Sequence, residues 1–113
     1  MGTLYAAIAI FGTTAILGLY LLSLVLRAKS TPKGVALIHG LLAVIALVLL
    51  IVYCVGHNPG PWASLVVFVI AAMGGLILGY RDLTGKSIPK WLGIVHGLAA
   101  IIGFALLLWF AFS

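Results

Sequence analysis

Two histidines, His39 and His96, are the residues of this chain whose type and setting could do chemistry. Each lies in an apolar stretch, at the same place in a short motif that occurs twice, 57 residues apart and without a gap. An imidazole in such a setting either binds a metal or hydrogen-bonds a polar group of a neighbouring helix. Because a repeat of about half the chain indicates duplicated architecture, we expect the two histidines to be a symmetry-related pair. The positions shared by the two copies are Lys29/Lys86, Ser30/Ser87, Pro32/Pro89, Lys33/Lys90, His39/His96, Gly40/Gly97 and Leu41/Leu98.

The elements that must position these histidines are apolar spans. Of the 113 residues, 65% are hydrophobic and only 6% are charged, and the mean hydropathy is +1.40. A soluble domain of this size would expose far more charge, so the composition indicates an integral membrane protein whose main partner is the lipid bilayer. Stretches near the length of about 20 residues that a spanning helix needs lie at about 4–26, 34–55, 62–80 and 91–112. Residues 1–113 would then form a single transmembrane domain.

The basic residues lie in two short loops, after the first and the third span. Because Lys and Arg stay on the cytoplasmic side, we expect both loops there and both termini on the outer, periplasmic side of what would be a bacterial inner membrane. The net charge of +5 is then a topology signal with some affinity for anionic headgroups, and it does not indicate nucleic-acid binding. The six residues are Arg27, Lys29, Lys33, Arg81, Lys86 and Lys90.

The repeated unit is a helical hairpin with its basic loop, at about residues 1–56 and 57–113. Each unit contains two spans, so both copies enter the membrane in the same sense, as a parallel repeat. The predicted fold is an all-α four-helix up-down bundle built from two parallel-repeat helical hairpins. In such a bundle the spans 34–55 and 91–112 are parallel and diagonal to one another. Pro32 and Pro89 are expected in the first turn of these spans, where a missing N–H costs nothing.

A stripe along the helix through each histidine, three residues before it and four and seven residues after it, carries only Ala and Gly. Positions three and four residues away share the face of a helical residue, and this set leaves an empty groove beside each imidazole. The alternative is that small residues only let the helices approach closely, and that each histidine hydrogen-bonds a carbonyl of a neighbouring helix. The small residues on or next to this face are Ala36, Gly40, Ala43 and Ala46 around His39, and Gly93, Gly97, Ala100 and Gly103 around His96; Gly18 and Gly75 lie at a similar depth on the other spans.

Two imidazoles without a carboxylate or thiol suit a haem better than a bare divalent ion. Zinc wants three or four protein ligands, whereas haem iron needs only one or two because the porphyrin supplies four nitrogens. The groove would accept a planar ring, and the six basic residues lie on the nearer membrane face, where they could hold its propionates. We therefore expect His39 and His96 to be the metal ligands of one haem. It would be haem b, since no Cys-x-x-Cys-His occurs for covalent attachment.

At this point the residues resemble a known family, the four-helix transmembrane b-type cytochromes. These proteins hold haem between histidines on alternate, parallel helices, with glycines on the remaining helices making room for the ring. His39 and His96 look like one such axial pair, and Gly18 and Gly75 look like the ring-facing glycines. The family usually carries two histidine pairs, whereas this chain has one. The resemblance implies electron transfer with a quinone or a redox partner protein.

Other interpretations stay open beside this one. The chain could be a haem carrier or sensor without redox turnover, or a small structural or accessory membrane subunit, and a homodimer is compatible with its glycine-rich spans. A self-contained enzyme is less favoured, because no carboxylate is placed to orient a histidine as a base. Of the remaining polar residues, we expect Asp82 to form a solvated ion pair with Arg81 in a loop. We expect Cys54 to be a packed free thiol and His57 to be a solvated turn residue.

Overall fold

The computed structural model describes all 113 residues and contains four helices joined by short loops. Each helix is long and apolar enough to cross a membrane, and the chain is a four-span integral membrane protein. The predicted spans are confirmed and each helix is slightly longer than expected; the third continues to Leu83 instead of ending at Tyr80. The helices are α1 (Gly2–Leu26), α2 (Lys33–Gly56), α3 (Trp62–Leu83) and α4 (Lys90–Phe112).

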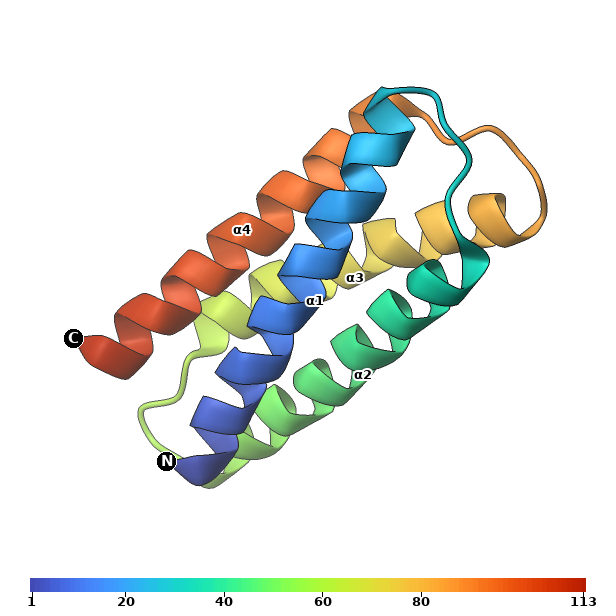
Figure 1. The fold of residues 1–113 in the computed structure, drawn as a ribbon. Coiled ribbons are helices and arrows are strands. Elements are labelled where there is room, and N and C mark those ends of the chain that lie inside the picture. Colours follow the sequence, from blue (N-terminus) through green and yellow to red (C-terminus); the bar gives the residue numbers. More distant parts are fainter.

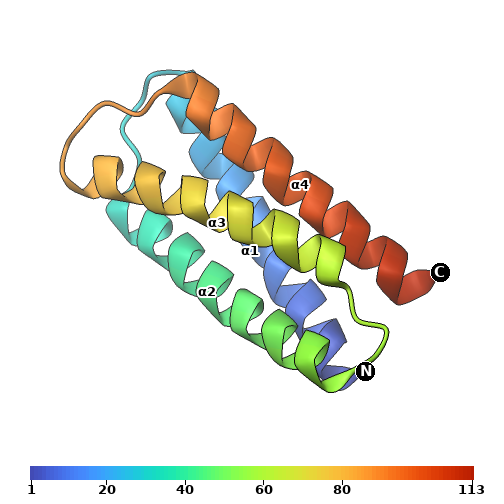
Figure 2. The same ribbon diagram turned by 180° about the vertical axis from the view of Figure 1, so that it is seen from behind.

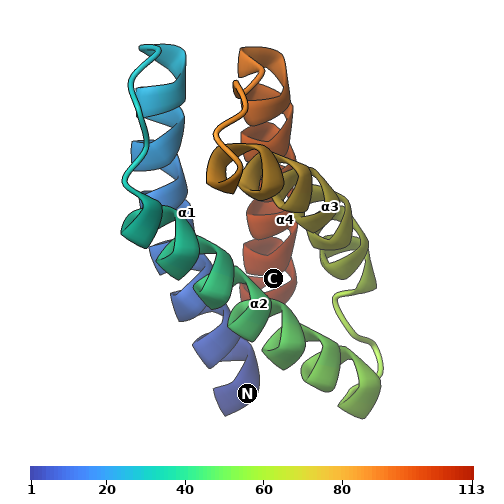
Figure 3. The same ribbon diagram turned by 90° about the vertical axis from the view of Figure 1, so that its right-hand side faces the viewer.

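The four helices pack around a common interior in chain order. α1 packs against α2 and α4, and α3 packs against the same two helices, whereas the backbones of the diagonal pairs, α1 with α3 and α2 with α4, do not approach each other. Figures 1 and 2 show the resulting bundle from two sides, and Figure 3 shows the α1–α2 and α3–α4 hairpins next to each other. The expected up-down bundle is confirmed, and α2 and α4 run parallel on its diagonal.

The two ends of the bundle differ in charge. The α1–α2 and α3–α4 loops lie together at one end (Figure 1), and all Lys and Arg side chains belong to these loops or to the adjoining helix turns. We call this the basic end. Both termini and the α2–α3 loop lie at the opposite end, which we call the terminal end.

Matching local signals build the two basic loops. Ala28 (φ 54°) and Gly85 (φ 73°) adopt left-handed backbone after α1 and α3, a conformation that commonly ends a helix. Pro32 and Pro89 are the N-cap residues of α2 and α4 in extended conformation, one position before the first turn in which we expected them. Their carbonyls accept the first helical hydrogen bonds, from Ala36 N at 3.1 Å and Gly93 N at 3.2 Å. A proline before a helix loses nothing by lacking an N–H.

The apolar core occupies only the half of the bundle next to the terminal end. Phe11 of α1 and Phe68 of α3 stack within it, with ring centroids 3.9 Å apart. In the half next to the basic end, Leu24 is the one large apolar side chain that is buried. The core cluster consists of Leu4, Ala7, Phe11, Ala46, Leu50, Tyr53, Cys54, Leu65, Phe68 and Leu107.

Polar residues in the helices follow simple local rules. Thr13 and Thr14 bond back to the carbonyls of Ala9 and Ile10, at 3.0 and 2.7 Å, which is how hydroxyls are satisfied inside a membrane helix. Cys54 is a buried free cysteine, as predicted.

Candidate functional site

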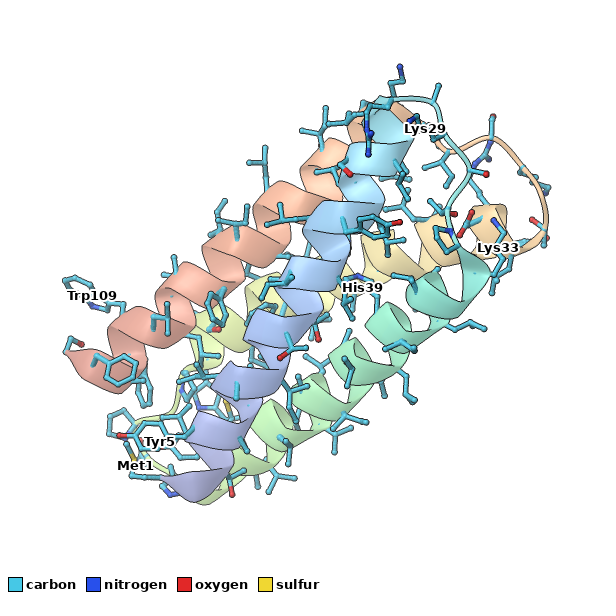
Figure 4. The ribbon with its side chains drawn as sticks, in the orientation of Figure 1. Met1, Tyr5, Lys29, Lys33, His39 and Trp109 are labelled. Carbon is cyan, nitrogen blue, oxygen red and sulfur yellow. The ribbon has the colours of Figure 1, made fainter.

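The two histidines face each other across the bundle interior. His39 lies on α2 and His96 on α4, both are partly buried, and their ring centroids are 6.3 Å apart with the ring planes at 83°. The backbones of α2 and α4 do not approach each other, so the two imidazoles reach toward one another across the diagonal. Figure 4 shows His39 in the bundle, farther from the basic end than Lys33. The structure therefore brings the predicted pair together.

A backbone carbonyl of the preceding helix holds each imidazole. Nδ1 of His39 lies 2.9 Å from the carbonyl oxygen of Thr14 on α1, and Nδ1 of His96 lies 2.7 Å from that of Ala71 on α3. Because a carbonyl can only accept, Nδ1 carries the donated hydrogen in both rings, and in the neutral imidazole the lone pair is then on Nε2. Neither Nε2 takes part in a hydrogen bond within the protein. This is the tautomer and the second hydrogen bond that histidine ligands of metals commonly have.

Gly18 and Gly75 make these contacts sterically possible. Each lies one turn after the accepting carbonyl, and a Cβ atom at either position would lie 2.9 Å from Cε1 of the facing histidine. That separation is too short for a side chain, so only glycine lets the imidazole reach the helix backbone. The structure thus places both glycines against the histidine rings. Contact of these glycines with a porphyrin stays a prediction.

The small residues next to the histidines divide into different settings. Gly93 is buried, and a Cβ there would lie 3.2 Å from Leu22 Cδ1 of α1. Gly97 packs against the same leucine, so both glycines serve the close approach of α1 and α4. Gly40 is exposed and has no neighbour within 4 Å of a built Cβ, so it is not brought to the histidine pair. The alanines that we expected beside the site, Ala36, Ala43 and Ala100, are partly buried.

The interpretation of Asp82 as a solvated loop residue beside Arg81 was wrong. Asp82 lies in the last turn of α3, is only 8% exposed, and forms an ion pair with Lys33 of α2. Its Oδ1 also accepts a hydrogen bond from the hydroxyl of Thr31 at 2.6 Å. The reason is that α3 extends beyond Tyr80 and so carries Asp82 against the start of α2. The sequence indicated that Asp82 would pair with a basic residue, since it is the one acidic residue beside six basic ones, but it did not indicate which of them.

The other basic residues predicted to bind the cofactor remain at the basic end. The guanidinium of Arg27 donates to Ser23 of its own helix, and Nε of Arg81 donates to the carbonyl oxygen of Ser87 at 2.7 Å. Lys90 forms no ion pair. His57, at the terminal end, is exposed and stacks on Tyr53, which agrees with its predicted place in a turn.

The distance between the two ring centroids is compatible with a metal shared by the two imidazoles. A metal-bound imidazole nitrogen lies about 2.0 Å from the metal and about 1.1 Å from its own ring centroid, so rings on opposite sides of one metal have centroids about 6 Å apart. The observed distance is 6.3 Å. The perpendicular ring planes are compatible with this arrangement, because each plane only has to contain the line from nitrogen to metal.

The site offers two imidazoles as possible metal ligands, without a third metal-binding side chain beside them. No group of three or more His, Cys, Asp or Glu side chains is placed to hold a metal ion. A metal between the histidines would therefore need ligands from another molecule.

Comparison with protein-family models, with curated proteins and with solved structures finds no match to this chain.

Proposed function

We propose that this protein binds one haem b between His39 and His96 and transfers electrons in the membrane, with a quinone or a redox protein as partner. The observation that carries the proposal is the pair of imidazoles whose centroids lie 6.3 Å apart, with Nδ1 bonded to a carbonyl and Nε2 left to ligate. When bound, a porphyrin iron supplies the four further ligands and the reversible one-electron chemistry.

The protein's own contribution is to hold both ligands ready. The carbonyls of Thr14 and Ala71 keep the proton on Nδ1 and make the Nε2 lone pair more basic, so that Nε2 binds a metal more strongly. Gly18 and Gly75 let each ring lie against a helix backbone, which restricts its rotation. Ligands fixed on packed helices in this way lose little freedom when they bind.

The distribution of the core supports a cofactor in this half of the bundle. Several large apolar side chains are buried in the interior near the terminal end. Near the basic end, Leu24 is the only large apolar side chain that is buried. A four-helix bundle that leaves part of its interior without such side chains is a usual site for a cofactor.

The basic end is proposed to hold the haem propionates. Lys33 is paired with Asp82, so we assign this role chiefly to Arg27 and Arg81. We further propose that this end faces the cytoplasm of a bacterial cell. The matched hydrogen bonds and glycine contacts of the two hairpins, at residues 57 positions apart, support their origin as a parallel repeat.

A reduced-minus-oxidised absorption spectrum of the purified protein tests the proposal. We expect a Soret band and sharp α and β bands on reduction, with one haem per chain. His39→Ala and His96→Ala should each lose most of the bound haem, whereas His57→Ala, a change of the exposed histidine at the other end, should retain it. A colourless protein from haem-sufficient cells would contradict the proposal and would favour the alternative in which the histidines only join helices.

Transfer of the haem to an excess of apomyoglobin separates an electron carrier from a haem carrier. A resident redox cofactor held by two histidines should transfer slowly and should be reduced by a quinol in vesicles. Rapid transfer without quinol reduction would show haem binding but would exclude the electron-transfer part of the proposal.

A further inference from the structure

A cavity of about 380 Å³ lies at the basic end, between the two basic loops. The residues of its wall come in pairs that lie 57 positions apart in the chain, so each hairpin contributes the same set of positions. Among these pairs are Lys29/Lys86, Ser30/Ser87 and Lys33/Lys90. The loops that carry them leave their helices through equivalent hydrogen bonds, from Lys29 N to Leu24 O at 2.9 Å and from Lys86 N to Arg81 O at 2.8 Å.

The charge around this cavity is unbalanced. Four lysines line it, and the only acidic side chain of the whole chain, Asp82, lies in the same wall. Asp82 forms its ion pair with Lys33, so Lys29, Lys86 and Lys90 have no carboxylate within the protein. Several like charges around one space repel each other, and an anion from outside would relieve that repulsion.

The other groups at the cavity also suit an anion with several oxygens. α2 and α4 both begin here, at Lys33 and Lys90, and the start of a helix carries a partial positive charge. The side-chain hydroxyls of Ser30 and Ser87 form no hydrogen bonds within the protein. The one carboxylate of the cavity wall, Asp82, already accepts a hydrogen bond from Thr31. Lysines, hydroxyls and helix starts together are the groups that proteins use to bind phosphate.

We infer that this cavity is a phosphate-binding site, separate from the histidine pair. Its volume of about 380 Å³ falls in the range of small-molecule sites and leaves room for the group that carries the phosphate. That group is either the headgroup of a phospholipid or a small soluble phosphate ester. Asp82 has a positioning role, because it fixes Lys33 on one wall and joins the two hairpins beside the cavity.

The first experiment titrates the purified protein in detergent with inorganic phosphate and follows the ³¹P resonance. The wild type should broaden the signal in a saturable way, and Lys29→Gln/Lys86→Gln should bind about ten-fold more weakly. Thr84→Gln is the control for Lys86→Gln, because it places the same side chain in the same loop at a residue outside the cavity wall. Equal weakening by Lys86→Gln and Thr84→Gln, or no saturable binding by the wild type, would overturn the inference.

A second experiment identifies the source of the phosphate. The protein is placed in phosphatidylcholine nanodiscs that contain some phosphatidic acid, and in parallel it is titrated with glycerol 3-phosphate. Preferential retention of phosphatidic acid that is lost in Lys29→Gln/Lys86→Gln assigns a lipid headgroup. Competition by glycerol 3-phosphate without lipid preference assigns a soluble ester, and a wild type that shows neither contradicts the inference.

The same titration in His39→Ala/His96→Ala keeps this inference distinct from haem binding. Phosphate should bind this variant as tightly as it binds the wild type, because the histidines do not line the cavity. If phosphate binds only after haem is removed, the haem propionates occupy the cavity. This result would exclude a separate phosphate site and would leave the haem proposal standing.

Discussion

The half of the bundle next to the terminal end and the half next to the basic end are held together by different interactions. The first half contains the core cluster, with the Phe11–Phe68 stack joining the two hairpins. The second half joins the hairpins through the Lys33–Asp82 ion pair and the packing of Leu22 on Gly93 and Gly97, and each of its histidines bonds to a carbonyl within its own hairpin. The buried apolar side chains are thus concentrated in one half, whereas polar contacts position the side chains of the other half.

Close backbone contact serves a different purpose in each half. In the core, Gly103 of α4 lets the ring of Phe68 approach, since a built Cβ would lie 3.1 Å from that ring. The Gly103 carbonyl also accepts a hydrogen bond from the buried hydroxyl of Ser64 at 2.8 Å. In the other half, Gly18 and Gly75 admit imidazoles instead of phenyl rings. Glycine thus admits a phenyl ring in one half and imidazoles in the other, where Gly93 and Gly97 also let α1 approach α4.

The largest effect on stability is expected from Phe68→Ala. Removing this ring breaks the stack with Phe11 and leaves a cavity, which should lower the free energy of unfolding by about 2–4 kcal/mol. Ile70→Ala is the control on the same helix, because Ile70 is 57% exposed and lipid can replace its contacts. Unfolding in mixed micelles of dodecyl maltoside and sodium dodecyl sulfate measures both. Equal losses in the two variants would contradict the larger contribution expected of the buried Phe68 ring.

A smaller effect, confined to haem binding, is expected from Gly75→Ala. The new methyl group would occupy the space of the His96 ring and force the ring out of its present position, so haem affinity should fall about ten-fold or more. Gly79→Ala is the matched control one turn later, because nothing lies within 4 Å of a Cβ built there. Titration with haemin, followed at the Soret band, gives both affinities. An unchanged affinity in Gly75→Ala would exclude a positioning role for this glycine.

The smallest effect on stability is expected from changes to the Lys33–Asp82 ion pair of the basic half. Asp82→Asn should lower the free energy of unfolding by about 1 kcal/mol, because Lys33 is half exposed and water already screens the pair. Lys33→Gln should cost more, since it leaves the buried carboxylate of Asp82 without its cation. Lys90→Gln is the control at the equivalent position of the other hairpin and should change stability by less than about 0.5 kcal/mol.

Comparing these variants at low and high salt sharpens the contrast between the halves. The loss caused by Asp82→Asn should shrink as salt screens the ion pair, whereas the loss caused by Phe68→Ala should not. If Asp82→Asn and Lys33→Gln both proved neutral at low salt, the ion pair would not contribute to joining the hairpins.

The helices and their order were predictable because the signals for them are local. Long apolar runs mark the spans, Pro32 and Pro89 mark where α2 and α4 start, and the basic loops mark which segments share an end. The histidine pair was also predictable, because two equal motifs in parallel helices must lie at one depth. These properties follow from hydropathy, chain connectivity and the rise of a helix, and they need no knowledge of packing.

The rotation of each helix was not predictable in the same way. All four helices are apolar on every face, so no polar stripe indicates which side turns inward. For this reason the exposed position of Gly40 and the packing of Gly93 against Leu22 emerged only from the structure. The same rotation decides that Gly18 contacts His39, whereas the sequence indicated only that the two residues lie at a similar depth.

The sequence by itself thus determined a four-span protein with a basic end and a pair of histidines at one depth. The tertiary structure decided which atoms meet: the carbonyls of Thr14 and Ala71 with the imidazoles, and Asp82 with Lys33. The physical reason is that hydropathy and helix geometry act along the chain, whereas hydrogen bonds and ion pairs form between residues 25 to 49 positions apart. Those contacts depend on how whole helices turn and pack, which no short segment encodes.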